Sequence, residues 1–298
     1  LHHGLTWIFV SDKYQLSLDA ILNRWDSGHY KNIIVSGYSG SNWAFFPLYP
    51  FIIKTLKIIY PGTISVVILG SLFSIFTFLL WFLLLIISKS NTSFLFPKTN
   101  LGFFSVVYAP SSFVYHSNHT ESLFLILSFL AFLLAQRNRL ISASIVSGLS
   151  ALTRNQGVFV AITVAFWLLI QQKNIRSKIV VFCKSGCISF CIFSLWLLFQ
   201  YLYTGNTFKF ISVHEHWHGV QSFTEYIQTF WFANPWQNTN LGSVLHHIFY
   251  FILCVGLVKL LIYKHPLFIY GLLSLLVIPM QGQLVNSFRY GSVLFPML

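Results

Sequence analysis

The chain has 298 residues, of which 56% are hydrophobic and only 8% are charged. A soluble domain carries roughly 25% charged residues, so this composition excludes a soluble globular enzyme, and its apolar content excludes a disordered chain. The formal net charge is +12, but most bases stand in short segments between apolar runs, as topology signals do. We therefore predict an all-α polytopic membrane protein that contacts membrane lipids and binds no nucleic acid.

Polar residues dominate 11–43, and the amphipathic segment 44–60, which contains Pro47 and Pro50, is typical of a helix lying along the membrane surface. Apolar runs then cover 63–87, 101–115, 120–135, 140–153, 155–170, 179–203, 241–263 and 266–280, and another begins at Tyr290. The runs 140–153 and 155–170 are short for full spans, so they are expected to be tilted, broken or partly re-entrant.

These runs predict one transmembrane domain over 1–298, with an outer loop and interfacial helix at 11–60 and a second outer loop at 204–240. We expect a bundle of about 8–10 membrane helices, each of about 20 residues where it spans fully. The chain starts at Leu1 and ends at Leu298 inside an apolar stretch, so we also expect both ends to be truncated.

The connections between the runs alternate in charge. Bases follow the first, third, fifth and seventh runs, at Lys89, Lys98, Arg137, Arg139, Lys173, Arg176, Lys178, Lys259 and Lys264. This side is predicted to be cytoplasmic. The opposite face collects 11–43, 116–119, 154, 204–240 and 281–289. Because ionisable groups at a membrane boundary are costly and often functional, a reaction site on the non-cytoplasmic face is predicted, with ordinary solvated loops as the alternative.

The segment RWDSGHY, from Arg24 to Tyr30, contains a candidate general base. Asp26 stands beside Trp25, a residue type that favours the membrane–water interface. A carboxylate there can take a proton from a hydroxyl within hydrogen-bond reach. The alternative is that Asp26 caps a short helix or pairs with Arg24.

Five segments, in this order, resemble the PIG-V-like mannosyltransferases, which include the enzyme that adds the second mannose to the GPI anchor and shorter prokaryotic relatives. They are RWDSGHY, then GYSGSNWAFFPLYP about ten residues later, HTESLF at 119–124, SGLSALTRNQGV at 147–158 and SFRYGSVLFP at 287–296. One segment departs: where relatives commonly have Gly-Asp-Pro, this chain has Gly205-Asn206-Thr207. A metal-binding or acceptor-binding role for that acid is therefore not carried over.

The resemblance implies a membrane glycosyltransferase of the GT-C type. Its donor would be a polyprenyl or dolichyl phosphate mannose, or a related hexose, and its acceptor a lipid-linked sugar or glycan. The resemblance also implies a catalytic acid in the first non-cytoplasmic loop, and Asp26 matches that position. Arg154 and Arg289 are the candidates for the donor phosphate, because a guanidinium fork pairs with phosphate oxygens. Further substrate-binding candidates are Trp25, Glu121, Asn155, Trp217 and Tyr290.

No cofactor is indicated with certainty. His214, His216 and His218 would share a face of an extended segment, as in a zinc or copper site, but no cysteine or second histidine pair stands at ligand spacing. We expect loop or substrate hydrogen bonds there, with a divalent metal as the alternative. The sequons at Asn91 and Asn118 are weak, since one lies on the predicted cytoplasmic side and the other almost in the bilayer.

Two rival functions remain at this point. A transporter or flippase of lipid-linked sugars would share the apolar helices and the arginines, but it should show inverted repeats, and none is visible. A non-catalytic subunit of a glycosylation complex is the other, and an enzyme with a partner subunit is a related alternative. The membrane would be that of the endoplasmic reticulum in a eukaryote, or the plasma membrane in a prokaryote.

Overall fold

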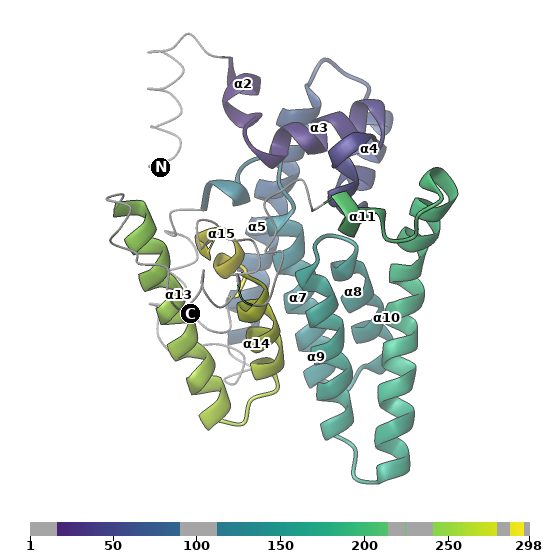
Figure 1. Cartoon of the computed structure of the whole chain (residues 1–298), viewed down its shortest axis with the longest axis vertical. Helices are drawn as coiled ribbons and strands as arrows, with labels where there is room; N and C mark the ends of the chain where they lie inside the picture. The colour runs from purple at the N-terminus through teal and green to yellow at the C-terminus, as the bar shows by residue number, and fades with distance from the viewer. Residues whose placement is uncertain (1–16, 90–111, 214–223, 225–240, 279–286, 295–298) are drawn as a thin grey trace.

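The computed structural model describes residues 17–89, 112–213, 224, 241–278 and 287–294, and these ranges contain helices and no strand (Figure 1). Three of the described helices are long and apolar enough to cross a membrane: α5 (Val66–Lys89), α10 (Ile175–Thr204) and α13 (Leu241–Ile262). Four more are apolar but shorter: α7 (Glu121–Gln136), α8 (Leu140–Ala151), α9 (Gln156–Ile170) and α14 (Leu267–Val277). The all-helical prediction is confirmed.

The short helices fall where the short apolar runs predict them. α8 has 12 residues and α9 has 15, so at 1.5 Å per residue they extend about 18 Å and about 23 Å. Both lengths are less than the roughly 30 Å of a hydrocarbon core. The two helices are joined by the turn at 152–155. The count of about eight to ten membrane helices stays a prediction.

Helices α7, α8, α9 and α10 form a bundle in which small polar side chains lie between α8 and α10 (Figure 1). The Oγ atoms of Ser144 and Ser185 are 2.8 Å apart, and those of Ser147 and Ser189 are 3.0 Å apart. Serine lets two helix backbones approach closely and hydrogen-bond across the contact in lipid. These serine contacts fix the register of α10, which is otherwise largely apolar, against α8.

Four short helices cover the upper end of the bundle in Figure 1: α2 (Leu18–Leu22), α3 (Asp26–Ser36), η1 (Gly40–Ala44) and α4 (Leu48–Ile59). α4 buries Tyr49 and Ile53 and exposes Phe51 and Ile58. It is therefore two-faced, as the sequence predicts for a helix at the membrane surface. The described residues of the segment 11–60 thus form a cap over the bundle, and the first residue of α3, Asp26, belongs to this cap.

The basic connections that lie within the described residues gather at the opposite end. Gln171 Nε2 donates to the carbonyl oxygen of Ala135 at 3.0 Å, and the side chains of Gln172 and Asn138 are 3.5 Å apart. These contacts place the α7–α8 and α9–α10 connections together. Figure 1 shows the α13–α14 connection at the same lower end. The arrangement agrees with the alternation of charge along the sequence.

Gly157 occupies the tightest point between α8 and α9. A Cβ at this position would lie 2.2 Å from the carbonyl oxygen of Ser150 and 2.4 Å from the amide nitrogen of Ala151. Backbone atoms cannot move aside as a flexible side chain can. Overpacking costs about 1–3 kcal/mol and more when the neighbour is rigid, so Gly157→Ala is expected to lose most of its folded protein.

The measurement is the yield of monodisperse protein in detergent and its melting temperature. Gly186→Ala is the matched control, because Gly186 also lies within a helix and a Cβ there meets nothing within 4 Å. Equal yield and melting temperature for the two variants would show that the α8–α9 approach is not as close as described.

Candidate functional site

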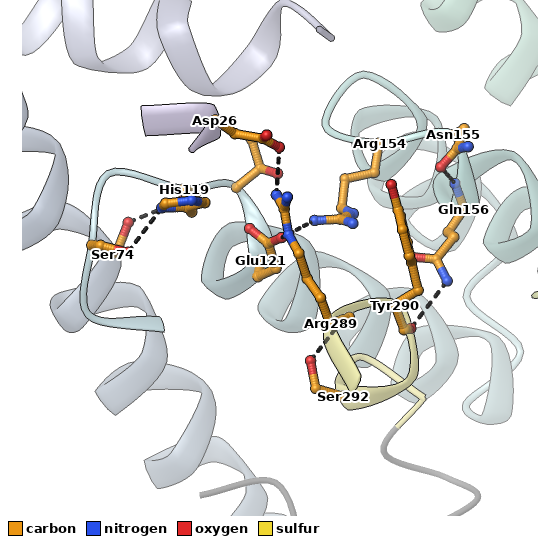
Figure 2. A network of polar contacts seen from close by, with 12 residues as sticks. Asp26, Ser74, His119, Glu121, Arg154, Asn155, Gln156, Arg289, Tyr290 and Ser292 are labelled. Carbon is orange, nitrogen blue, oxygen red and sulfur yellow. Dashed lines mark hydrogen bonds and ion pairs between the residues drawn. The ribbon is translucent and has the colours of Figure 1, made fainter. Parts of the chain in front are cut away.

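Four charged side chains from separate parts of the chain meet beneath the cap (Figure 2). Asp26 is the first residue of α3 and Glu121 is the first residue of α7. Arg154 lies in the turn between α8 and α9, and Arg289 lies in the short helix α15 (Ser287–Ser292). The structure therefore brings together the candidate base, both candidate phosphate ligands and one of the substrate-binding candidates.

The four residues form a continuous chain of ion pairs in which Arg289 stands between the two acids. Its Nη2 lies 2.6 Å from Asp26 Oδ2, and its Nε lies 2.5 Å from Glu121 Oε1. Arg154 Nη1 forms an ion pair with the same Glu121 oxygen. Two acids and two bases balance in charge, which is the condition under which charged groups remain ionised away from water.

Solvent reaches one end of this chain of ion pairs and not the other. The side chains of Asp26 and Arg289 are 21% and 16% exposed, whereas those of Arg154 and Glu121 are 7% and 0% exposed. Asp26 and Arg289 are therefore an outer pair that a substrate can touch. Glu121 lies behind them and positions both guanidinium groups.

The backbone is strained next to the candidate base. Trp25 has φ of 49° and ψ of −126°, a combination that a side chain with a Cβ rarely adopts. Such strain costs about 1–3 kcal/mol and clusters at functional sites. The Trp25 side chain is 70% exposed, and its ring centroid lies 4.7 Å from that of Phe113. Trp25 thus borders the accessible edge of the site.

Arg154 is also held by Tyr290 and its neighbours. The Arg154 guanidinium lies over the Tyr290 ring, 5.4 Å from the centroid, which is within the range of a cation–π contact. Gln156 Nε2 donates to the carbonyl oxygen of Tyr290 at 3.3 Å. The side chain of Asn155 accepts from the Gln156 amide at 2.9 Å and so caps α9. Sequence reasoning proposed Asn155 and Tyr290 and missed Gln156.

The loop between η2 (Ser112–Tyr115) and α7 is buried beside the ion pairs and fixed by hydrogen bonds. Asn118 Nδ2 donates to the carbonyl oxygen of Ser27 at 3.1 Å, and Tyr49 OH donates to Asn118 Oδ1 at 2.9 Å. Asn118 is fully buried, so its sequon is inaccessible in the folded protein. His119, in the same loop, is a site residue that the sequence analysis did not select.

Other sequence candidates are placed elsewhere. Trp217 and the three alternating histidines lie outside the described residues, as does Asn91. Asn206 Oδ1 accepts from the Phe208 amide at 2.9 Å in the turn after α10, so it has a local structural use. Among the described residues, no group of three or more His, Cys, Asp or Glu side chains is arranged to hold a metal ion.

The chain matches the family model described as Mannosyltransferase (PIG-V) over residues 6–278. The chain belongs to the PIG-V mannosyltransferase family. No curated protein and no solved structure matches it. Asp26, Glu121 and Arg154 lie inside the matched residues, whereas Arg289 and Tyr290 lie beyond them and enter the site through the fold.

Membership of the PIG-V family makes this chain a glycosyltransferase that transfers mannose between a donor and an acceptor. The transporter and non-catalytic readings gain no support from it. The apolar helices make the PIG-V family member an integral membrane protein. Of the residues at its site, Asp26 has the accessibility and chemistry of a proton acceptor, and Arg289 those of an anion ligand.

The charge state of Asp26 is set by Arg289. Burial alone would raise the pKa of this carboxyl, but the Arg289 guanidinium outweighs burial through charge and a hydrogen bond, with a smaller contribution from His119; Glu121 opposes them. The pKa of Asp26 is therefore held below its ordinary value of 3.8. A group with a depressed pKa keeps its proton-accepting form until the pH falls through that lower value.

The pH dependence of mannosyl transfer should show this coupling. In the wild type, kcat/KM is expected to fall only at about pH 4 and below, where His119, whose pKa burial lowers to about 4, and then Asp26 take up protons. In Arg289→Gln the burial effect on Asp26 is no longer outweighed, so the acid limb of the residual activity should move to higher pH. Superimposable normalised profiles would show that Arg289 does not set the pKa of Asp26, the candidate base.

Proposed function

We propose that this PIG-V family member transfers mannose from a polyprenyl or dolichyl phosphate to a hydroxyl of a lipid-linked or glycan acceptor. The observation that carries the proposal is the outer pair, in which a partly accessible carboxylate and guanidinium lie 2.6 Å apart. Such a pair offers one group to the attacking hydroxyl and one to the leaving phosphate. Asp26 serves the attacking hydroxyl and Arg289 serves the leaving phosphate.

The donor phosphate competes with Asp26 for Arg289. A phosphate that reaches the exposed Nη2 edge takes over the hydrogen bond now made to Asp26, while Nε remains on Glu121. Asp26 then loses the cation that depresses its pKa and becomes a better base. Donor binding in this way prepares the base that the acceptor hydroxyl needs, and Glu121 with Arg154 keeps Arg289 in place.

The reaction is a single displacement. The acceptor oxygen forms a bond to the anomeric carbon of mannose, the bond from that carbon to the phosphate oxygen breaks, and the acceptor proton passes to Asp26. The polyprenyl phosphate leaves with its charge matched by Arg289. One displacement inverts the configuration at the anomeric carbon, so the product has the anomeric form opposite to that of the donor.

The site is proposed to face the non-cytoplasmic side. Support comes from the basic connections at 137–139 and 171–174, which lie together at the end of the bundle away from the cap. The exposed ring of Trp25 beside Asp26 is a further support, because tryptophan favours the level of the lipid headgroups. A donor whose phosphate travels at that level meets Arg289 without leaving the membrane.

The test uses purified protein in liposomes with total membrane lipid as the acceptor source. Radiolabelled mannose is supplied as dolichyl phosphate mannose in one arm and as GDP-mannose in the other. Label is expected to enter acceptor only from the dolichyl donor, and NMR of the product should show an inverted anomeric centre. Transfer from GDP-mannose alone, or retention of configuration, would contradict the proposal.

A further inference from the structure

His119 occupies an unusual place beside the ion pairs. Its side chain is 1% exposed, and it lies within electrostatic range of all four charged residues of the site. In Figure 2 its ring stands on the side of Glu121 away from Arg154, next to Asp26. The mechanism proposed above gives this imidazole no contact with a substrate. A buried imidazole at the centre of a reaction site calls for a physical account.

The hydrogen bonds of Ser117 determine which nitrogen of His119 has the proton. Ser117 Oγ donates its only hydrogen to the carbonyl oxygen of Phe113 at 2.9 Å. The same oxygen lies 2.8 Å from His119 Nδ1, so at this contact it accepts and Nδ1 donates. Burial lowers the pKa of His119 to about 4, and the ring is neutral at pH 7. Nε2 therefore presents a lone pair.

That lone pair has no protein partner among the described residues. Nε2 is buried and makes no hydrogen bond, and leaving a buried acceptor unsatisfied costs about 1–3 kcal/mol. The ring is held by the contact of Nδ1 with Ser117 Oγ at 2.8 Å and by Phe113, which packs edge-on at 6.0 Å, while Ser74 Oγ donates to the His119 carbonyl oxygen at 3.1 Å and fixes the backbone. The nearby guanidinium groups are already engaged by Asp26 and Glu121. Among the described residues no donor serves this atom, and a neutral donor on a bound substrate would satisfy it.

We propose that His119 Nε2 accepts a hydrogen bond from a hydroxyl group of the sugar that binds at this site. The inference rests on the proposed function and adds a substrate-binding residue to it. A hydroxyl is the donor that suits this lone pair, since a third cation would upset the charge balance of the two acids and two arginines. A sugar carries several such hydroxyls, and His119 would select one of them.

Two substitutions of His119 test the roles of its two ring nitrogens separately. In His119→Asn the side-chain amide reaches the position of Nδ1 and keeps the contact with Ser117, but nothing replaces Nε2. In His119→Gln the longer side chain brings an amide oxygen to the position of Nε2. Donor binding is expected to weaken by about tenfold or more in the asparagine variant and to be largely kept in the glutamine variant. Melting temperatures of both proteins control for folding.

The decisive readout uses sugars that lack one hydroxyl. Wild type and His119→Asn are titrated with dolichyl phosphate mannose and with a set of donors that each lack a single mannose hydroxyl. In the wild type one member of the set should bind about tenfold more weakly than the parent. In His119→Asn the same deletion should cost nothing, because its partner is already gone. A purely structural role for His119 would lower all affinities together.

A parallel arm distinguishes the two sources of the hydroxyl. Octyl mannoside and its singly deoxygenated forms serve as acceptors in transfer reactions with the parent donor. Coupling to His119 in donor titrations assigns the hydroxyl to the donor sugar, and coupling only in the acceptor KM assigns it to the acceptor. If the wild type binds and transfers but neither series shows coupling, the role of His119 is overturned while the proposed function stands. If the wild type does not bind the dolichyl donor, both are overturned.

Discussion

Replacing Asp26 with asparagine is expected to reduce mannosyl transfer by about 10²- to 10⁴-fold while the protein remains folded. The amide has nearly the shape of the carboxyl group, and its oxygen can still accept from Arg289 Nη2, which lies 2.6 Å from Asp26 Oδ2. What it loses is the ability to take a proton from the acceptor. The measurement is the initial rate of label transfer from dolichyl phosphate mannose, at equal amounts of folded protein.

Asp19 provides the matched control. It stands in the same capping segment, where it pairs with Lys31 at 3.4 Å and accepts a hydrogen bond from Ser65 Oγ, and its side chain is 30% exposed. Asp19→Asn should transfer at close to the wild-type rate, because exposed ion pairs contribute about 0–1 kcal/mol. If Asp26→Asn is as active as Asp19→Asn, then Asp26 has a structural role and another group removes the proton.

Replacing Glu121 with glutamine is expected to have the largest effect on stability. Glu121 is fully buried, and one of its oxygens contacts both Arg154 and Arg289. Without its charge, two buried guanidinium groups repel each other with only the partly exposed Asp26 to balance them. Removing one partner of a buried ion pair costs about 3–5 kcal/mol. A fall in melting temperature and in folded yield, measured in detergent, should report it.

A double substitution tests whether this cost comes from the unpaired charge. In Glu121→Gln/Arg154→Met one acid and one base are lost together, and the remaining pair of Asp26 and Arg289 is balanced. Replacing a buried pair by apolar side chains is often neutral. The double variant should therefore be more stable than Glu121→Gln alone. If the two losses simply add, the contact between Glu121 and Arg154 contributes nothing and the ion-pair chain is wrongly described.

The helices of the fold were largely predictable, because a run of apolar residues and the polar segment that ends it are both local features of the sequence. The run at 120–135 became α7, the run at 140–153 became α8, and the apolar pattern of 44–60 became the two-faced α4. The described part of the run at 266–280 became α14, which ends at Val277, and residues 279–280 lie outside the described residues.

The members of the site were predictable in part, but their pairing was not. Charge alternation along the chain placed Asp26, Glu121, Arg154 and Arg289 on one face, because the polar segment 11–43 and the ends of the apolar runs near the other three fall on the side opposite the basic connections. The alternative partner of Asp26, its neighbour Arg24, was suggested by sequence proximity alone, and the contact is made by Arg289 instead. Pairing depends on the packing of α15 against α13 and η2, which brings the Arg289 side chain to Asp26 and Glu121 and which no local pattern encodes.

His119 and Gln156 show the same limit. Both stand within segments that resemble the family, yet the role of each side chain depends on its burial and on hydrogen bonds to other residues. The tautomer of His119 follows from Ser117 and Phe113, and the use of Gln156 follows from the carbonyl group of Tyr290. A signal existed in the pattern HTE, where an imidazole precedes a carboxylate by two residues, but it has many structural explanations.

The position of Arg289 has a consequence for how the enzyme is made. Asp26 and Glu121 are synthesised long before Arg289, so the nascent protein carries two acids and one base at this point until α15 is added. The charge balance of the four residues is therefore reached only when Arg289 contacts Asp26 and Glu121. Before that contact forms, one carboxylate of the set has no cationic partner, and such a group is costly away from water.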